Sequence, residues 1–272
     1  MINTLSRALE QAAVMTWAHF KRAWRMKYNM VNWAIIDALW LLIFIFAGLA
    51  FTPPEYYPRV VPILFFSMVL WSLMSTPIWA IGNWVRFYIN IGLIDEHELA
   101  GASHVAFLAT RSIPSTIISI ISAIAVGTIL YLATGVNPLR VGNIPLLLFS
   151  MVMVLSMATA YALIIAFAGM KLKVPAPMLD IMNIAFFFIG GVAVDVDNIP
   201  WPLTIVAVLT PYSHPAELMR YAVSGFPPYL GFAGEVLASI IFLALLAAIV
   251  AVVYRIAYTD YRSLGARGVG LT

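Results

Sequence analysis

Six long apolar stretches dominate this sequence, at residues 30–51, 60–85, 105–134, 145–169, 176–194 and 230–256. Each is about as long as the helix of roughly 20 residues that crosses the hydrocarbon core of a bilayer. Hydrophobic residues make up 63% of the 272 residues and charged residues only 10%, whereas soluble domains carry about 25% charged residues. The pattern predicts an all-α integral membrane protein, in which residues 1–272 form one transmembrane domain with six spans.

Residues 3–27 predict an amphipathic helix ahead of the first span. Its apolar side chains recur at steps of three or four and form one stripe, at Leu5, Leu9, Ala13, Trp17, Phe20 and Trp24. Basic and polar side chains fall on the opposite side. Trp together with Lys and Arg is typical of a helix that lies in the headgroup layer, and the same residues would also suit a cytoplasmic flank of the first span.

The positions of Lys and Arg predict which side of the membrane each loop faces, because cytoplasmic loops are enriched in both. With the N-terminus inside, twelve of the fifteen basic residues fall on the cytoplasmic side, and three fall outside, Arg59, Arg140 and Arg220. Both termini, the 90–104 segment and the Lys171–Lys173 loop are then cytoplasmic. We therefore expect a multi-pass protein of the cytoplasmic (inner) membrane.

The segment between the fifth and sixth spans, residues 195–228, is apolar but is interrupted by six prolines. It predicts two short helices, at about 200–209 and 214–224. Neither could cross a hydrocarbon core of about 30 Å at 1.5 Å per residue. We expect an external re-entrant helical hairpin over 199–224, packed against other helices so that its backbone polar groups find partners.

Sequence motifs of catalysis are absent. The chain contains neither the P-loop pattern of ATP-binding proteins nor the H-E-x-x-H pattern of zinc proteases. It has no Cys, and its four His residues are too scattered for an obvious metal site. We expect no catalytic residue, no metal and no cofactor in this chain, and the net charge of +3 gives no indication of nucleic-acid binding.

Acidic residues inside membrane spans are costly and are candidates for function. We place Asp37 and Asp180 within apolar stretches, with Asn183 on the same face as Asp180. These residues could couple transport to protons or cations, which would make the protein an ion-coupled secondary carrier or channel. They could equally reach the interface or pair with a neighbouring Lys or Arg.

A short acidic segment follows the second span. Asp95, Glu96 and Glu98 lie near the start of a predicted short helix between Gly92 and Gly101, where carboxylates favour the positive end of the helix dipole. In the predicted topology they face the cytosol. The segment could dock into a basic groove of a partner, or it could be a solvated acidic loop.

The third span carries two local signals. Ser119, Ala123 and Gly127 recur at steps of four, and small residues at this spacing allow helices to approach closely. Ordinary packing, a transport surface and a dimer contact are all compatible with that stripe. Arg111 and Pro114 predict that the first turns of the span lie at the interface and that the helix kinks there.

Three parts of the chain stand in a characteristic order. The helix at 3–27 comes first, the run Gly92-Leu93-Ile94-Asp95-Glu96-His97-Glu98-Leu99-Ala100-Gly101-Ala102-Ser103 follows the second span, and the run from Gly190 to Arg220 follows the fifth. This order resembles the membrane subunits of type-2 ABC exporters, the permeases for drugs, polysaccharides and lipid-linked compounds. The chain departs from that family where Gly101-Ala102-Ser103 replaces an expected Pro and Thr210-Pro211 replaces the usual Asn-Pro.

The resemblance implies a permease subunit that works with a cytoplasmic P-loop ATPase, which would bind ATP and Mg. It also implies a homodimer, or a heterodimer with a similar permease. Coupling to the ATPase would run through a helix at 93–103, with Gly92, Asp95, Glu96, Glu98 and Leu99. An external gate would include Trp201, Tyr212, His214, Glu217, Arg220 and Tyr221, in which Glu217 and Arg220 are close enough in sequence to pair.

The expected substrate is hydrophobic or amphipathic, either drug-like or lipid-like, and moves outward. Short loops leave no large external domain to capture a ligand. The 8 Trp, 12 Tyr and 16 Phe residues suit membrane interfaces, and they could also stack on sugars, so a polysaccharide or glycolipid is the alternative substrate. The ion-coupled carrier is the alternative function, ahead of a membrane scaffold or enzyme.

Overall fold

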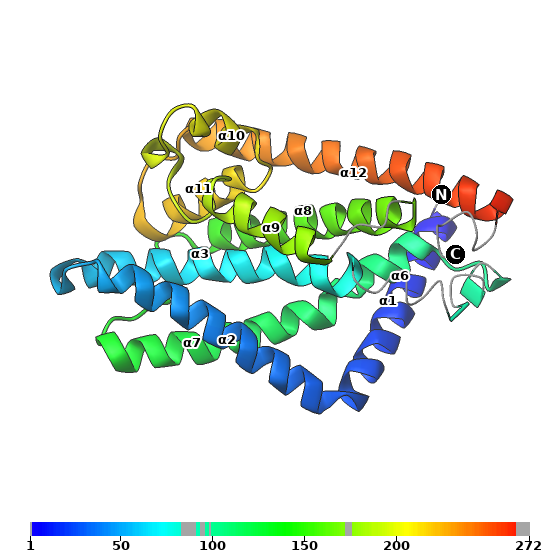
Figure 1. Ribbon diagram of the computed structural model, residues 1–272, viewed down its shortest axis with the longest axis horizontal. Helices are drawn as coiled ribbons and strands as arrows, with labels where there is room; N and C mark the ends of the chain where they lie inside the picture. The colour runs from blue at the N-terminus through cyan, green and yellow to red at the C-terminus, as the bar shows by residue number, and fades with distance from the viewer. Residues whose placement is uncertain (1, 83–90, 93–95, 98, 172–175, 265–272) are drawn as a thin grey trace.

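Helices make up the described parts of the protein (Figure 1). The computed structural model describes residues 2–82, 91–92, 96–97, 99–171 and 176–264, and it describes the backbone alone at 2–6, 8, 170–171, 176–180 and 264. No strand occurs in these ranges. The helices are α1 (Ile2–Arg25), α2 (Lys27–Ala50), α3 (Tyr57–Pro77), α6 (His104–Thr110), α7 (Ser112–Thr134), α8 (Ile144–Lys171), α9 (Ala176–Phe188), α10 (Leu203–Leu209), α11 (Ser213–Ser224) and α12 (Gly231–Leu264).

Within the described ranges, five segments are long and apolar enough to cross a bilayer, Lys27–Ala50, Pro54–Gly82, His104–Thr134, Ile144–Gly169 and Gly231–Ser263. They correspond to the first four predicted spans and to the last. The fifth predicted span, 176–194, contains only the 13-residue α9, which is about 20 Å long at 1.5 Å per residue. That length is short of a hydrocarbon core of about 30 Å, so helix length does not confirm the six-span count.

Two of the predicted spans are interrupted beside a proline. α3 ends at Pro77 and continues as a π-helical turn over Ile78–Gly82. Arg111 separates α6 from α7, three residues before Pro114. Proline has no N–H, and its ring crowds the carbonyl four residues earlier, which here belongs to Thr110. The kink predicted for the third span therefore appears as a break in the helix.

The centre of the bundle is α3, which packs against α2, α7, α8 and α11 (Figure 1). Leu70 and Met74 of α3 are fully buried. α8 contributes a row of fully buried small residues at steps of four, Ala158, Ala162 and Ala166. Small side chains at this spacing let neighbouring helices approach closely, and α8 packs against α3, α11 and α12.

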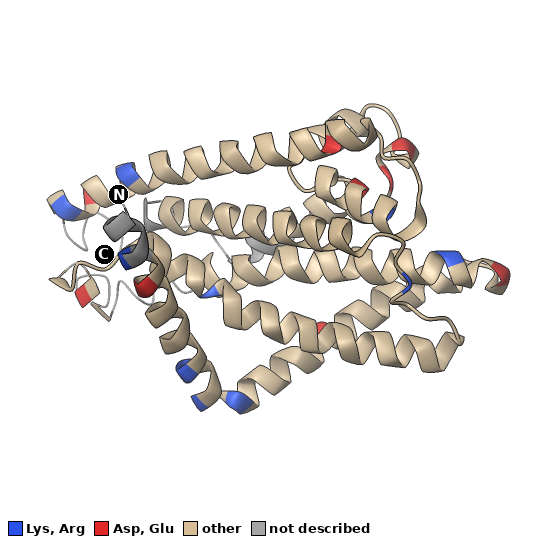
Figure 2. Cartoon of the chain, turned by 180° about the vertical axis from the view of Figure 1, so that it is seen from behind, with Lys and Arg blue, Asp and Glu red and all other residues tan. Residues whose placement is uncertain are grey.

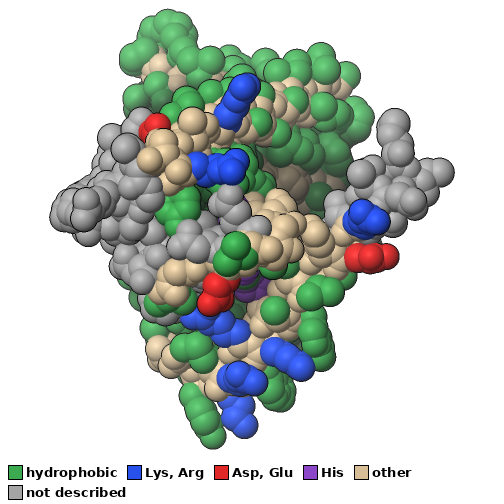
Figure 3. All heavy atoms as spheres, turned by 90° about the vertical axis from the view of Figure 1, so that its right-hand side faces the viewer, with side chains coloured by type: hydrophobic (Ala, Val, Ile, Leu, Met, Phe, Trp, Pro, Cys, Tyr) green, Lys and Arg blue, Asp and Glu red, His purple; other side chains and the backbone are tan. Residues whose placement is uncertain are grey.

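Charged side chains divide the molecule into two ends (Figure 2). Lys and Arg gather at the end that carries α1, α6 and the last turns of α12, whereas α10 and α11 lie at the other end. An end-on view shows basic side chains spread over the face of the first end (Figure 3). This is the end that the sequence analysis assigns to the cytoplasm, and the assignment itself stays a prediction.

The segment after α9 forms two short helices close to the predicted ranges, α10 at Leu203–Leu209 and α11 at Ser213–Ser224. Most of α11 is buried, because it packs against α3, α8 and α12. The prediction of a packed pair of helices agrees with these contacts. Re-entry into the membrane is not tested by them.

α1 meets α2 at Met26 and turns away from it across the end of the bundle (Figure 1). Leu9, Trp17 and Trp24 of its predicted apolar stripe are exposed, and so they are available to lipid. His19, by contrast, is buried, and α1 packs against α6. α1 thus joins the bundle through one face and leaves its aromatic face uncovered.

Candidate functional site

The predicted coupling helix is described in part, between two glycines. Gly92 and Gly101 have φ angles of +73° and +65°, a region that glycine enters without strain. Between them the Ala100 N–H donates to the Glu96 carbonyl at 3.0 Å. Glu96 is exposed, and Leu99 is 89% exposed. Two predicted members of this site lie outside the described residues, Asp95 and Glu98.

His97 connects this turn to the helices behind it. Its ring lies 4.1 Å from the ring of Phe107 in α6, edge to face. Phe107 also packs against His19 of α1, at 4.7 Å between ring centres. The Nε2 of His19 is 2.9 Å from the Phe107 carbonyl oxygen, and because a carbonyl only accepts, Nε2 carries the proton. A displacement of the turn would therefore reach both α6 and α1.

A second set of ring contacts connects the start of α6 with the end of α12. His104 is buried, and its Nδ1 lies 3.3 Å from the Tyr254 hydroxyl. Its ring is 5.7 Å from that of Tyr258. Tyr254 and Tyr258 stack on each other at 5.4 Å. His104, the first residue of α6 and three positions after Gly101, thus contacts α12.

Burial controls the charge of the two histidines that contact Phe107. It lowers the pKa of His19, and the positive charges of Arg111 and Arg22 act in the same direction, against the raising effect of the bond to the Phe107 carbonyl. Burial likewise lowers the pKa of His97. Both rings are therefore neutral near pH 7, and both contacts are made by uncharged imidazoles.

At the opposite end, Arg220 of α11 holds the turn that follows α9. Its guanidinium donates to the carbonyls of Gly191 at 2.6 Å and Val192 at 3.1 Å, and to Glu217 Oε1 at 2.6 Å. It also forms an ion pair with Asp195. Arg220 and Glu217 are both buried. The predicted Glu217–Arg220 pair is thus present, as part of a buried network.

A second buried pair joins α11 to α12. His214 Nδ1 lies 2.7 Å from Glu235 Oε2, and both side chains are buried. His214 Nε2 is 3.0 Å from the Val208 carbonyl, and the Leu230 N–H donates to Glu235 Oε1 at 2.9 Å. The pair therefore joins the start of α12 to α11 and to the last turn of α10.

The predicted gate residues occupy two different environments. Tyr212, His214, Glu217 and Arg220 are buried, whereas Trp201 is 75% exposed. Tyr221 is partly buried, with its ring 6.2 Å from that of Phe232. His214, Glu217 and Arg220 hold the neighbouring loops through hydrogen bonds, and a gating role for the six stays a prediction.

Among the intramembrane candidates, Asp37 of α2 has a clear environment. Both of its carboxylate oxygens accept from the Ser72 hydroxyl of α3, at 3.1 and 2.9 Å. No Lys or Arg of the described residues pairs with it. The side chain of Asp180 lies outside the described residues. Asn183 is buried, and its amide has no hydrogen-bond partner in the described structure.

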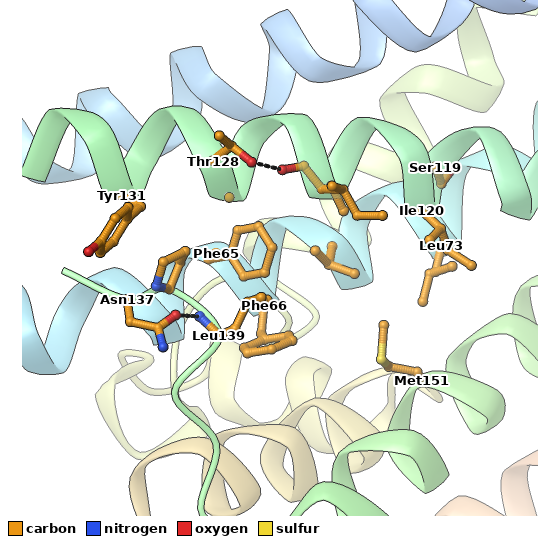
Figure 4. Close-up of a pocket in the computed structure, with 15 residues that line it drawn as sticks. Phe65, Phe66, Leu73, Ser119, Ile120, Thr128, Tyr131, Asn137, Leu139 and Met151 are labelled. Atoms are coloured by element: carbon orange, nitrogen blue, oxygen red, sulfur yellow. Dashed lines mark hydrogen bonds between the residues drawn. The ribbon is translucent and has the colours of Figure 1, made fainter. Parts of the chain in front are cut away.

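A cavity of about 620 Å³ lies between α3 and α7 (Figure 4). The small residues Ser119, Ala123 and Gly127 line it, so the predicted stripe borders a cavity in addition to packing. Phe65 and Phe66 line its middle (Figure 4). Tyr131 and Asn137 lie together at one end, and Ser119 lies at the other. An apolar cavity with polar ends suits the hydrocarbon part of an amphipathic molecule.

A family model described as the ABC-2 type transporter matches residues 10–224, from α1 to the end of α11. The matched range covers most of the chain. The chain belongs to the ABC-2 type transporter family. A comparison with curated proteins gives no match.

As an ABC-2 permease, the chain is the transmembrane component of a transporter and is not itself catalytic. Such a component works with an ATP-binding subunit. Among the described residues, no group of three or more His, Asp or Glu side chains could hold a metal ion.

One charged residue of the ABC-2 chain was overlooked in the sequence analysis. Glu235 lies within the last predicted span, 230–256, so Asp37 and Asp180 are not the only acidic residues placed in apolar stretches. The sequence offered a signal for Glu235, because it is an acidic residue in the first turns of an apolar run. Its partner, His214, could not have been assigned, because the two lie 21 residues apart in different helices.

Proposed function

We propose that this chain is the permease subunit of an ATP-driven exporter in the cytoplasmic (inner) membrane. It would move a hydrophobic or amphipathic compound outward, as one half of a homodimer or of a heterodimer with a similar permease. A cytoplasmic P-loop ATPase would bind ATP and Mg and dock at the turn between Gly92 and Gly101. Family membership supports the transporter class, and the geometry of that turn supports the docking.

The observation that carries this proposal is the exposed turn with a rigid connection behind it. Glu96 and Leu99 are exposed, at the end of the molecule where Lys and Arg gather (Figure 2). His97, two residues before Leu99, is packed on Phe107 of α6. This contact joins the exposed turn to the membrane helices, which favours a docking surface over a merely solvated loop.

The contacts define how motion could pass from the ATPase to the membrane. A push on the turn would move Phe107 and α6, and His19 would carry the same movement to α1. His104 would carry it to the end of α12 through Tyr254 and Tyr258. ATP would thereby bias two arrangements of the helices, in the way that ligands shift a two-state equilibrium.

Purification of the chain from its native membrane in mild detergent tests this proposal. A P-loop ATPase should co-purify, with ATPase activity, and should be lost when Glu96 and Glu98 are both changed to Lys. Glu55→Lys is the matched control, because it reverses an exposed charge at the opposite end. Co-purification that survives the Glu96/Glu98 change, or is lost equally with Glu55→Lys, would contradict docking at the turn.

One observation favours the second candidate, an ion-coupled carrier. Asp37 is an intramembrane carboxylate hydrogen-bonded to Ser72, with no cationic partner in the described structure, and such residues often mark proton or ion pathways. This candidate predicts transport by the purified chain alone in liposomes, driven by an ion gradient. A polysaccharide or glycolipid remains the alternative substrate of the exporter.

A further inference from the structure

α2 carries two exposed tryptophans beside its only acidic residue. Trp33 is 56% exposed and Trp40 is 54% exposed. They stand four residues before and three residues after Asp37, and side chains at these spacings lie on one face of a helix. The three side chains therefore form a continuous strip, which we call the Trp33–Asp37–Trp40 strip.

Asp37 lies at the edge of that strip, next to the buried face of α2. Leu41 and Ile45 are fully buried, and Asp37 is partly buried. Its carboxylate is held by the Ser72 hydroxyl at 2.9 and 3.1 Å. The Ser122 hydroxyl of α7 also acts on this carboxylate. Two hydroxyls still leave acceptor capacity on a carboxylate, which has about four lone-pair sites.

The position along α2 puts this carboxylate within the predicted first span, 30–51. Asp37 is ten residues beyond Lys27, where α2 begins, which is about 15 Å at 1.5 Å per residue. A carboxylate at such a depth is costly without a counter-charge, and no Lys, Arg or His in the described ranges supplies one.

Aromatic rings continue from the strip onto neighbouring helices. Trp40 stacks on Phe44 at 5.9 Å, and Phe44 lies 6.1 Å from Phe188 of α9. Phe187 of α9 meets Trp71 of α3 edge to face at 4.9 Å. Beside the carboxylate there is thus an extended aromatic surface, and aromatic faces attract cations electrostatically.

We propose that the Trp33–Asp37–Trp40 strip recognises a lipophilic cation as the substrate of the exporter. The inference rests on the proposed export function and narrows its substrate class. The carboxylate would supply the counter-charge, and the indole faces would hold the cation and its apolar groups. We choose a cation as the occupant because its charge is complementary to that of the carboxylate. A neutral lipid would leave the carboxylate without a counter-ion, and an anion would be repelled.

Equilibrium binding of two lipophilic ions to the purified chain in lipid nanodiscs tests this proposal. Tetraphenylphosphonium is a cation of fixed charge, and tetraphenylborate is an anion of the same size. The wild-type chain should bind the cation about tenfold or more tightly than the anion, a ratio in the range that a desolvated cation–π contact supplies. The fixed charge of the probe separates cation recognition from protonation of Asp37.

Asp37→Asn keeps the shape and the hydrogen bond to Ser72 but removes the charge. We expect it to abolish the preference for the cation, and Trp33→Leu with Trp40→Leu to weaken cation binding about tenfold while leaving anion binding unchanged. Asp197→Asn, at an exposed carboxylate outside the spans, should behave as the wild type. An unchanged preference in Asp37→Asn would overturn the proposal.

Two other occupants of the strip give different results. If a second copy of the chain covers it, neither ion will bind the wild-type dimer. If lipid alone covers it, neither ion will bind the chain beyond its own partition into empty nanodiscs. Either result would overturn cation recognition. The co-purification of the ATPase, measured on the same Asp37→Asn variant, is independent of this result, so the failure of the substrate class and the failure of the exporter function can be told apart.

Discussion

A single buried guanidinium organises the loop at the end of the bundle that carries α10 and α11. Arg220 has five N–H donors in a fixed planar arrangement. It donates to the carbonyls of Gly191 and Val192 and to the carboxylate of Glu217, and it forms an ion pair with Asp195. A lysine at this position would present one compact ammonium group and could not reach four acceptors. The turn after α9 is therefore fixed by the geometry of one side chain.

Removing this guanidinium should destabilise the protein strongly. We expect Arg220→Ala to lower the free energy of unfolding by about 3–5 kcal/mol, because Glu217 would stay buried without its cation. Arg220→Lys should restore only part of the loss. Thermal unfolding in detergent measures the effect, with the exposed Arg140→Ala as the control. Equal midpoints for Arg220→Ala and Arg140→Ala would show that the network contributes little.

The histidine of α1 predicts how stability depends on pH. Burial lowers the pKa of His19 below its usual 6.5, so the folded protein binds fewer protons than the unfolded chain between that lowered pKa and 6.5. The free energy of unfolding should therefore fall as the pH drops below about 6.5. Unfolding midpoints at about pH 8 and about pH 5.5 measure this loss. His19→Gln keeps a donor toward the Phe107 carbonyl without titrating, and it should lose less stability than the wild type on acidification.

At the scale of helices, the sequence predicts an element well where the length and apolar content of a segment determine whether it forms a helix. The boundaries of α2 and α8 lie close to the predicted spans, because a run of apolar residues in a bilayer has few alternatives to a helix. α12 begins close to the predicted start but ends at Leu264, eight residues beyond the predicted end at 256. α9 shows the limit of that reasoning. Residues 189–194 are as apolar as the helix before them, but the backbone turns at Gly190 and Gly191, where Arg220 captures the carbonyl of Gly191.

Contacts between helices were beyond the reach of the sequence. His97 and Phe107 lie on either side of Gly101, and nothing in their spacing indicates that the rings meet. The Asp37–Ser72 bond joins residues 35 positions apart. Periodicity predicts which face of a helix is apolar, but the neighbour that covers a face is decided by packing. The candidate site was therefore predicted as a set of residues and not as a set of contacts.

Two glycines in and beside the membrane helices should respond in opposite ways to alanine. A Cβ at Gly127 of α7 would meet Phe65 and Pro138 at ordinary distances of 3.5 and 3.6 Å, so Gly127→Ala should stabilise the helix by up to about 1 kcal/mol. A Cβ at Gly190 would overlap the Phe186 carbonyl oxygen and approach Thr210 Cγ2 at 2.8 Å.

Gly190→Ala should therefore destabilise the protein by about 1–3 kcal/mol, the usual effect of overpacking. Thermal unfolding of both variants under the same detergent conditions measures the difference. A lower midpoint for Gly127→Ala than for Gly190→Ala would contradict the packing around these two positions.

Over the whole molecule, one end carries the helical turn between Gly92 and Gly101 and the other carries two buried ionic clusters. Ring contacts connect α1, α6 and α12 at the first end, and Arg220 and the His214–Glu235 pair hold the loops at the second. Aromatic contacts connect three helices at the first end, whereas hydrogen bonds from buried polar side chains hold the loops at the second. A movement of the Gly92–Gly101 turn is therefore expected to reach α1, α6 and α12 together.

The absence of Cys makes the sidedness of the two ends directly testable. Single cysteines can replace the exposed Ser103, beside α6, and the exposed Arg140, between α7 and α8. A membrane-impermeant maleimide should label Arg140→Cys in intact cells and Ser103→Cys only after the membrane is permeabilised. The reverse pattern would place the Gly92–Gly101 turn outside and would contradict docking to a cytoplasmic ATPase.

The exposed aromatic face of α1 has a consequence for energetics. Leu9, Trp17 and Trp24 are uncovered by protein, while His19 on the same helix is tied to α6. If α1 lies in the headgroup layer as predicted, held by its tryptophans, it could not follow α6 without displacing lipid. The lateral pressure of that leaflet would then enter the work of each turnover of the proposed exporter, and the rate would vary with headgroup packing as well as with ATP.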